Sequence, residues 1–149
     1  MKKLILLLLF IPLISFSQAL EKHQIQSVVE TFFKGFHEKD STVINSVLNN
    51  SFNLNSISYK ENNAVLKSYI GDTFISAVIS RNDNPVWTEK LMSFEIKIDG
   101  PLANAWVEYE FWLDGKLSHC GVNSIHLIKE KNGWKIFNIT DSRRFNCQS

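Results

Sequence analysis

The clearest pattern near the start of the chain is an amphipathic helical stripe. Apolar residues recur at three- and four-residue spacing between residues 25 and 36, at Ile25, Val28, Val29, Phe32, Phe33 and Phe36. This spacing predicts a helix with one continuous buried face. Asp40 and Ser41 then offer side-chain oxygens that can cap a second, shorter helix. The buried side of that helix carries Val43, Ile44, Val47 and Leu48.

Two strands and a third helix are predicted next. Residues 52–59 and 64–70 are rich in β-branched, aromatic and leucine residues, and Asn62-Asn63 between them is typical of a turn. The segment Gly71-Asp72-Thr73 then begins a third helix. Its apolar residues, Phe74, Ile75, Val78 and Ile79, repeat the spacing of the second helix. Residues 81–85 read as a polar loop.

Beyond residue 85 the apolar spacing changes to two, which predicts β-strands. Apolar and polar residues alternate over 92–99 and again over 103–113. Asp114-Gly115 and Asn132-Gly133 are typical of tight hairpin turns. Helices and a hairpin followed by a long antiparallel meander indicate an α+β fold with helices on one side of a single sheet.

The two hairpin turns give a trial register for the last strands. If each turn has two residues, Tyr109 faces Cys120 and Ser124 faces Asp141. The inner sheet face then carries Val107, Tyr109, Phe111, Cys120, Val122, Ser124, His126, Ile128, Phe137, Ile139, Asp141 and Arg143. A single bulge would exchange the two faces beyond it.

The N-terminal segment has the order of a secretory signal peptide. Lys2 and Lys3 precede an apolar run from Leu4 to Ile14, and small residues stand at Ser15 and Ser17. Cleavage is therefore predicted between residues 17 and 18. The apolar run is too short to span a bilayer, so no stable membrane insertion is expected. The 149 residues minus 17 leave 132, residues 18–149, which suits one domain.

The net charge and the two cysteines limit the classes of partner and cofactor that this chain is expected to bind. The formal charge of +1 falls to −1 once Lys2 and Lys3 are removed, so no basic field suggests nucleic acid. Cys120 and Cys147 have no close Cys or His at ligand spacing, and no metal site or cofactor is predicted. In an exported bacterial protein, periplasmic or secreted, the two cysteines can form a disulfide. The trial register places Cys120 opposite Phe145, so a bend of the tail would bring Cys147 within bonding range.

Three segments carry a resemblance to a known superfamily: VVETFFKGFHEKDSTVINSVL, DTFISAV and HCGVNSIHLIKEKNGWKIFNITDSRR. The chain resembles the nuclear transport factor 2-like superfamily, which includes ketosteroid isomerase, scytalone dehydratase and the SnoaL-like cyclases. The last segment is similar to small exported bacterial members that carry a lumazine-binding label. The resemblance implies a cone-shaped, cystatin-like α+β fold with a pocket between a curved sheet and three helices. It also implies frequent homodimers through the convex sheet face, where Trp106 and Trp112 lie, but no single activity.

Asp40, Tyr109 and Asp141 match the residue types of ketosteroid isomerase-like sites, but their motif context does not match. Asp40 is explained better as the cap of the second helix than as a base, so that activity is not transferred. His119 and Cys120 are adjacent on a strand and point to opposite faces, which argues against a catalytic pair.

Three functional hypotheses follow. The first is a domain that binds a small, partly apolar molecule in its cone. Its candidate walls are Phe32, Phe36, Tyr109, Phe111 and Phe137, and its candidate polar contacts are His126, Asp141 and Arg143. The second is an acid/base enzyme that uses His126 or Asp141. The third is a structural or protein-interaction module with a cone filled by its own side chains.

Overall fold

The computed structural model describes residues 11–147, with side chains from residue 18 onward. The first ten residues of the predicted signal peptide lie outside this part of the chain. The elements, in chain order, are α2 (Ile11–Glu38), α3 (Ser41–Ser46), β1 (Leu48–Lys60), β2 (Asn63–Ile70), α4 (Gly71–Ser80), β3 (Trp87–Asp99), β4 (Leu102–Leu113), β5 (Lys116–Glu130) and β6 (Gly133–Arg144). None of the helices in the described residues has the length and apolar character needed to cross a membrane.

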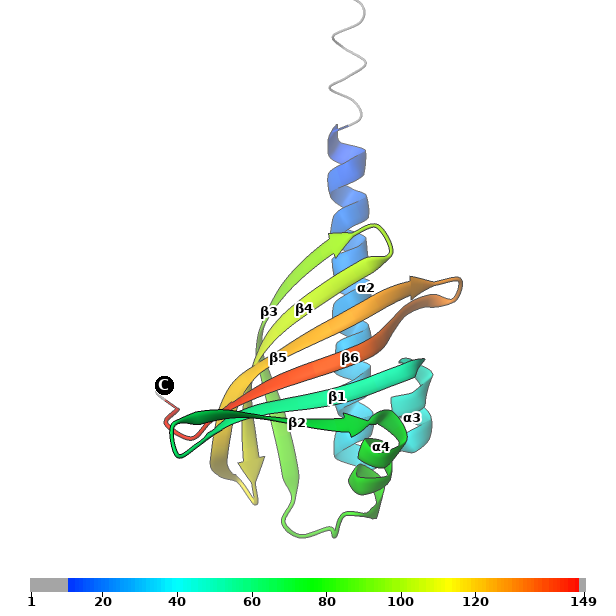
Figure 1. Ribbon diagram of the computed structural model, residues 1–149. Coiled ribbons are helices and arrows are strands. Elements are labelled where there is room, and N and C mark those ends of the chain that lie inside the picture. Colours follow the sequence, from blue (N-terminus) through cyan, green and yellow to red (C-terminus); the bar gives the residue numbers. More distant parts are fainter. Residues whose placement is uncertain (1–10, 148–149) are drawn as a thin grey trace, which may run out of the picture.

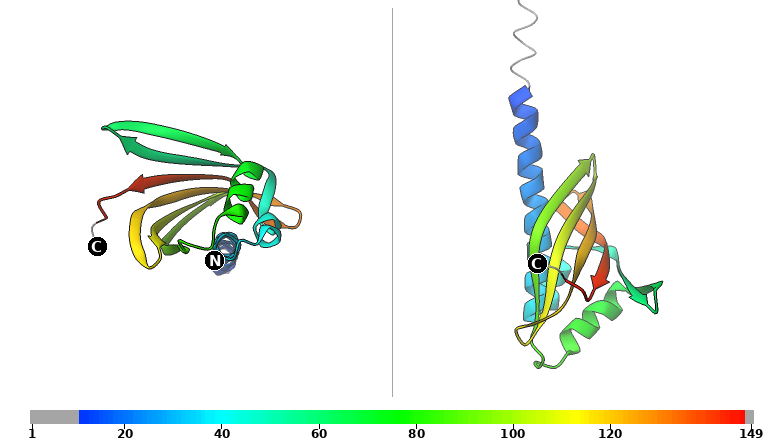
Figure 2. Two further views of the ribbon diagram at one scale, coloured as in Figure 1. Left: turned by 90° about the horizontal axis from the view of Figure 1, so that it is seen from below. Right: turned by 90° about the vertical axis from the view of Figure 1, so that its left-hand side faces the viewer.

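The six strands form one curved sheet in the order β2-β1-β6-β5-β4-β3 (Figure 1). Strands β1 and β6 are parallel, and the other neighbours are antiparallel. The helices lie on one side of this sheet, and the views along and across α2 show the sheet curving toward them (Figure 2). The predicted α+β architecture, with helices on one face of a single sheet, is confirmed.

Helix α2 supplies one wall of the core. The predicted stripe is buried, with Ile25 and Val29 fully inaccessible and Phe32, Phe33 and Phe36 at most 6% exposed. The stripe packs against the concave face of β3, β4 and β6. After α2, Asp40 accepts hydrogen bonds from the backbone N–H groups of Thr42 at 2.8 Å and Val43 at 3.0 Å. The predicted helix cap at Asp40 is therefore confirmed.

The trial register holds at the first turn, where Leu113 lies opposite Lys116, and is wrong beyond that turn and throughout the second hairpin. A bulge between Phe111 and Trp112 shifts the β4–β5 pairing, so that Tyr109 lies opposite Gly121 and not Cys120. In the β5–β6 pair, Glu130 lies opposite Gly133, which moves the turn back by one residue. A second shift follows after His126, and Asp141 lies opposite Asn123.

The bulge in the β4–β5 pair exchanges the faces of β5. Because neighbouring strand residues point to opposite sides of a sheet, a one-residue slip moves a whole row. The inner row of β5 is His119, Gly121, Asn123, Ile125 and Leu127, all buried. The residues predicted to lie inside, Cys120, Val122, Ser124, His126 and Ile128, lie on the outer face.

The predicted disulfide between Cys120 and Cys147 is present, with the two Cα atoms 5.9 Å apart. Cys120 lies opposite Arg144, near the end of β6, and not opposite Phe145 as the trial register placed it. The tail after β6 bends back toward β5 as required. The bond therefore fixes residues 145–147 beside the rim of the curved sheet.

Candidate functional site

A cavity of about 740 Å³ lies between the concave face of the sheet and helices α2 and α4. Most of its wall is apolar and aromatic. Helix α2 contributes Phe32, Phe33 and Phe36, helix α4 contributes Phe74 and Val78, and the sheet contributes Trp87, Tyr109 and Phe111. A volume of this size suits a small organic molecule.

The aromatic wall is held together by ring contacts and by one arginine. Phe36 and Phe74 are stacked with ring centroids 6.5 Å apart, and Trp87 meets Phe111 edge-on at 5.7 Å. The guanidinium of Arg81 lies 5.0 Å from the Phe36 ring and 5.1 Å from the Trp87 ring. Arg81 also donates to the Phe36 carbonyl at 2.7 Å. Because Arg81 binds both the rings and the end of α2, it fixes this wall in place.

Asp141 is the centre of a polar cluster on the opposite wall. It is 5% exposed and accepts hydrogen bonds from Arg143 Nε at 2.8 Å and from Ser56 Oγ at 3.2 Å. Burial acts to lower the pKa of Arg143, but the hydrogen bond and charge of Asp141 outweigh burial and raise this pKa. The Asp141 carboxylate is thus fully engaged by neighbouring donors.

Tyr109 joins this cluster from β4. Its hydroxyl donates to the Ser142 carbonyl at 3.0 Å and lies 3.5 Å from Asp141 Oδ2. Burial, reinforced by the charges of Asp141 and Glu89, raises the pKa of the phenol. Tyr109 therefore stays neutral and serves as a hydroxyl group in the cavity wall. Gly121, directly opposite on β5, leaves the space that the Tyr109 ring occupies.

Glu89 is the acid that sequence reasoning missed. Its carboxylate accepts a hydrogen bond from Asn123 Nδ2 at 2.7 Å, and its backbone N–H donates to His37 Nε2 at 2.9 Å. Burial raises the pKa of Glu89 to about 7, while the Asn123 hydrogen bond opposes that rise and the charge of Asp141 adds to it. This carboxyl group changes charge near neutral pH.

The inward position of Glu89 depends on a bulge between Leu91 and Ser93. The alternation of Phe94, Ile96 and Ile98, continued backward without a bulge, places Lys90 inside and Glu89 outside. The bulge reverses this order. The nearest signal in the sequence is Trp87, an aromatic residue two positions before Glu89 on the same face.

His119 also lies in the cavity, although the trial register placed it on the outer face. Its ring stacks on Phe111 with centroids 4.8 Å apart and meets Tyr109 edge-on at 5.9 Å. Burial, followed by the positive charge of Arg143, lowers the pKa of His119. The imidazole is therefore neutral at neutral pH.

Six of the sequence-predicted site residues line this cavity: Phe32, Phe36, Tyr109, Phe111, Asp141 and Arg143. Two do not. His126 and Phe137 contact each other, with ring centroids 6.0 Å apart, away from the cavity lining. Their predicted inner position is wrong for two reasons: the bulge between Phe111 and Trp112 turns the row of β5 that contains His126 outward, and the shift between His126 and Leu127 leaves Phe137 as an extra residue in β6.

Comparison with known proteins identifies the fold. No protein-family model and no curated protein matches the chain. Among solved structures, an NTF2-like protein of unknown function from Shewanella baltica matches 85% of this chain and 95% of its own at a TM-score of 0.63 and 16% identity. An NTF2-like protein with a cystatin-like fold from Novosphingobium aromaticivorans matches 89% of this chain and 88% of its own, at a TM-score of 0.71 and 10% identity.

A third structure, from Streptomyces avermitilis, carries the provisional name of a dehydratase of the NTF2-like family. It matches 82% of this chain and 94% of its own, at a TM-score of 0.61 and 11% identity. At these identities the likeness concerns the fold alone. The chain has the nuclear transport factor 2-like, cystatin-like fold that its sequence resembles.

Proposed function

We propose that this chain is an exported protein that holds a small, partly apolar molecule in its cone. The observation that carries the proposal is the 740 Å³ cavity, whose aromatic walls from α2, α4 and the sheet enclose a cluster of polar groups. A structural module would be expected to fill its cone with its own side chains. An apolar cavity with a few convergent polar groups is the usual form of a small-molecule site.

A fluorescent apolar probe tests this proposal. N-phenyl-1-naphthylamine brightens when it enters an apolar cavity, and we expect saturable brightening with this protein. Ala77 lines the cavity from α4, and the neighbouring Ser76 does not. Ala77→Trp should abolish the brightening, whereas Ser76→Trp, which adds the same bulk outside the cavity, should retain it. Equal brightening in both variants, or none in the parent protein, would overturn the proposal.

Export is part of the same proposal. The described side chains from residue 18 to residue 24 are mostly exposed, and the buried stripe of α2 begins at Ile25. The described core therefore begins beyond the predicted cleavage point, and the Cys120–Cys147 disulfide suits an oxidising compartment. N-terminal sequencing of protein recovered from the cell envelope or medium should begin at Gln18. A chain that begins at Met1 would contradict it.

Acid/base catalysis is a second candidate function, favoured by the pKa of about 7 at Glu89. A group that titrates near neutrality can both accept and donate a proton. In this hypothesis Glu89 replaces His126, which lies outside the cavity. NMR can follow deuterium exchange at the α-carbon of cyclohexanone. Catalysed exchange should be lost in Glu89→Gln and reduced in Asp141→Asn; the same rate in both variants and the parent protein would exclude this function.

A further inference from the structure

The described lining of the cavity has two acidic side chains, Glu89 and Asp141, and one basic side chain of the lysine or arginine type, Arg143. Asp141 and Arg143 are paired through Nε at 2.8 Å, with a second contact from the guanidinium at 3.5 Å. Among the described residues of the lining, Arg143 is the single lysine or arginine. Apart from Asp141, which is paired with Arg143, Glu89 is the acidic side chain in the described lining, and it has no cationic partner there.

Only one of the two Glu89 oxygens is used. Oε1 accepts from Asn123, and within the described part of the chain Oε2 has no hydrogen-bond partner. The backbone of Glu89 is fixed by its bond to His37 on α2 and by its pairing with Phe111 on β4. The carboxylate is therefore presented from a fixed backbone position in the cavity lining, with Trp87 on the same face of β3 and Phe111 opposite on β4.

We propose that the natural ligand is an organic cation, an ammonium group on a compact apolar body, whose N–H donates to Glu89. This inference rests on the proposed ligand-binding function. The fold already buries Glu89 in part, which lowers the further desolvation cost on the protein side when a cation binds. Trp87 and Phe111 line the same cavity and offer an aromatic surface to the apolar body of the ligand.

An anionic ligand has no comparable partner. The guanidinium of Arg143 is paired with Asp141 through Nε and one Nη nitrogen, so a carboxylate that reached it would compete with an existing ion pair. His119 is neutral at neutral pH and Tyr109 is a neutral hydroxyl. The cavity therefore discriminates by charge and accepts a cation in preference to an anion of the same shape.

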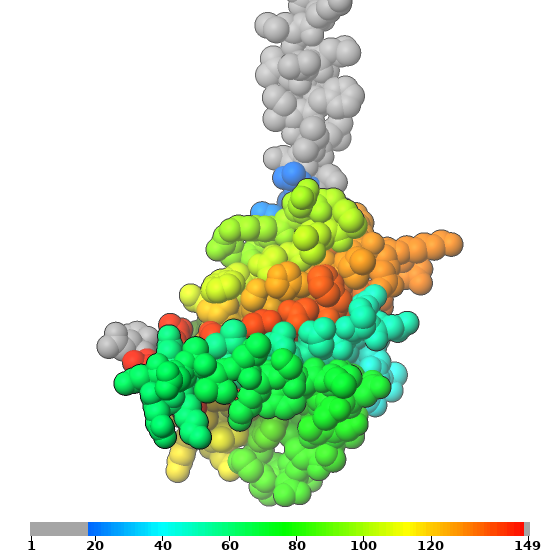
Figure 3. Space-filling model, in the orientation of Figure 1, coloured from blue at the N-terminus to red at the C-terminus, as the bar shows by residue number. Residues whose placement is uncertain are grey.

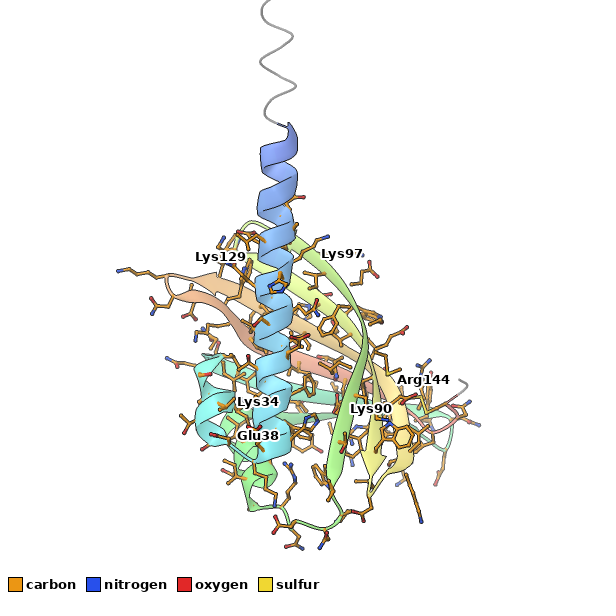
Figure 4. The ribbon with its side chains drawn as sticks, turned by 180° about the vertical axis from the view of Figure 1, so that it is seen from behind. Lys34, Glu38, Lys90, Lys97, Lys129 and Arg144 are labelled. Carbon is orange, nitrogen blue, oxygen red and sulfur yellow. A yellow bond between two sulfur atoms is a disulfide. The ribbon has the colours of Figure 1, made fainter. Side chains whose placement is uncertain are left out.

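Other charged groups surround Glu89 on every packed element. From α2, Glu30, Lys34, His37 and Glu38 share with Glu89 the shallow groove between α2 and β3. Lys34 and Glu38 are labelled near the lower end of α2 in Figure 4. From the sheet, Tyr109 on β4, His119 on β5, and Asp141 and Arg143 on β6 share the cavity. Protonation of His119 at low pH would weaken cation binding in the same direction as protonation of Glu89, so the variants below are compared at a pH where His119 is neutral.

Three probes that share the adamantane body and differ in charge test this preference: 1-adamantylamine, 1-adamantanol and adamantane-1-carboxylate. Each probe is titrated into the protein by calorimetry at pH 8. We expect the amine to bind at least tenfold more tightly than the alcohol, in line with hydrogen bonds to charged groups, and the carboxylate to bind most weakly. Below pH 7 the affinity for the amine should fall by up to tenfold per pH unit as Glu89 takes up its proton.

Glu89→Gln tests the residue itself. We expect this variant to lose at least tenfold in affinity for the amine and to change less than twofold for the alcohol. Glu95→Gln, on the exposed face of the same strand, is the matched control and should leave all three affinities unchanged. Binding of the alcohol also reports that the Glu89→Gln variant is folded.

The outcomes are distinct. If the alcohol or the carboxylate binds the parent protein as tightly as the amine, the cation inference fails while ligand binding stands. If none of the three probes binds, the cation inference and the proposed function both fail. If Glu89→Gln keeps the preference for the amine, Glu89 is not the group that recognises the ligand and the inference is overturned.

Discussion

Asn123 on β5 donates a hydrogen bond to Glu89 on β3 at 2.7 Å, across the intervening strand β4. The curvature of the sheet makes this reach possible, because inward side chains on a concave face converge. The bond supports the ionised form of a carboxyl group that burial otherwise keeps protonated. Burial and the Asn123 hydrogen bond act in opposite directions on the pKa of Glu89 and together set the charge of this carboxyl group in the cavity.

The first prediction concerns stability against pH. The pKa of Glu89 is about 7 in the folded protein against a usual 4.5, so the folded state binds more protons than the unfolded chain between these values. The free energy of unfolding should fall as pH rises from 4.5 to 7. At about 1.4 kcal/mol per pKa unit, this contribution is roughly 3 kcal/mol.

Urea unfolding of the parent protein and Glu89→Gln over pH 4.5–8 measures this effect. The variant should gain stability relative to the parent as the pH rises. His37 and His119, whose pKa values burial lowers, act in the opposite sense below pH 6.5 in both proteins and cancel in the difference. A constant difference between the two proteins across this range would contradict the prediction.

The second prediction concerns the disulfide. Cys120 and Cys147 are 27 residues apart, and the bond restricts the unfolded chain. Cys147→Ser should lower the free energy of unfolding by roughly 3 kcal/mol in the chain-entropy account. Chemical denaturation under oxidising conditions measures the loss. Adding a thiol reductant should destabilise the parent protein to a similar degree and leave Cys147→Ser unaffected; an unchanged parent would refute the role of the bond.

The third prediction concerns Gly121, where β5 and β6 approach closely. A Cβ atom at this position would lie 1.7 Å from the Ser142 carbonyl oxygen and 3.0 Å from the Tyr109 ring. Gly121→Ala should cost more than about 3 kcal/mol or prevent folding, because the obstruction is backbone. Gly100→Ala, in an open turn at φ +55°, should cost only about 1 to 2 kcal/mol. Thermal unfolding compares the two, and equal losses would be evidence against a steric origin.

The fourth prediction is a homodimer through the outer sheet face, the face seen in Figure 3. Trp106 is 48% exposed on this face and pairs with Glu95 on β3 and Ser124 on β5. Trp112 is less available, because the ammonium group of Lys90 lies over its ring, 3.9 Å from the ring centre. Aromatic side chains are enriched at interfaces. Light scattering should give twice the monomer mass, and Trp106→Lys should give the monomer. Tyr59→Lys, on the exposed β1–β2 hairpin, is the control and should remain a dimer.

Much of the architecture could be predicted from the sequence, because it depends on local patterns. The stripe from Ile25 to Phe36 fixes which face of α2 is buried, whatever it packs against. Asp40 caps α3 through contacts two and three residues away. The change of apolar spacing after residue 85 sets the order of helices and strands. From these patterns the fold and six of the residues that line the cavity follow.

The tertiary structure decided which polar residues share the cavity. Three one-residue irregularities, between Leu91 and Ser93, between Phe111 and Trp112, and between His126 and Leu127, exchange inward and outward rows. They bring Glu89, His119 and Asn123 inside and turn His126 out. A bulge involves no residue type that the sequence marks, because its position is set by how neighbouring strands curve around a shared core. The sequence by itself therefore determined the elements, part of the aromatic wall and the inward Asp141 and Arg143, and strand pairing decided which other polar residues join them.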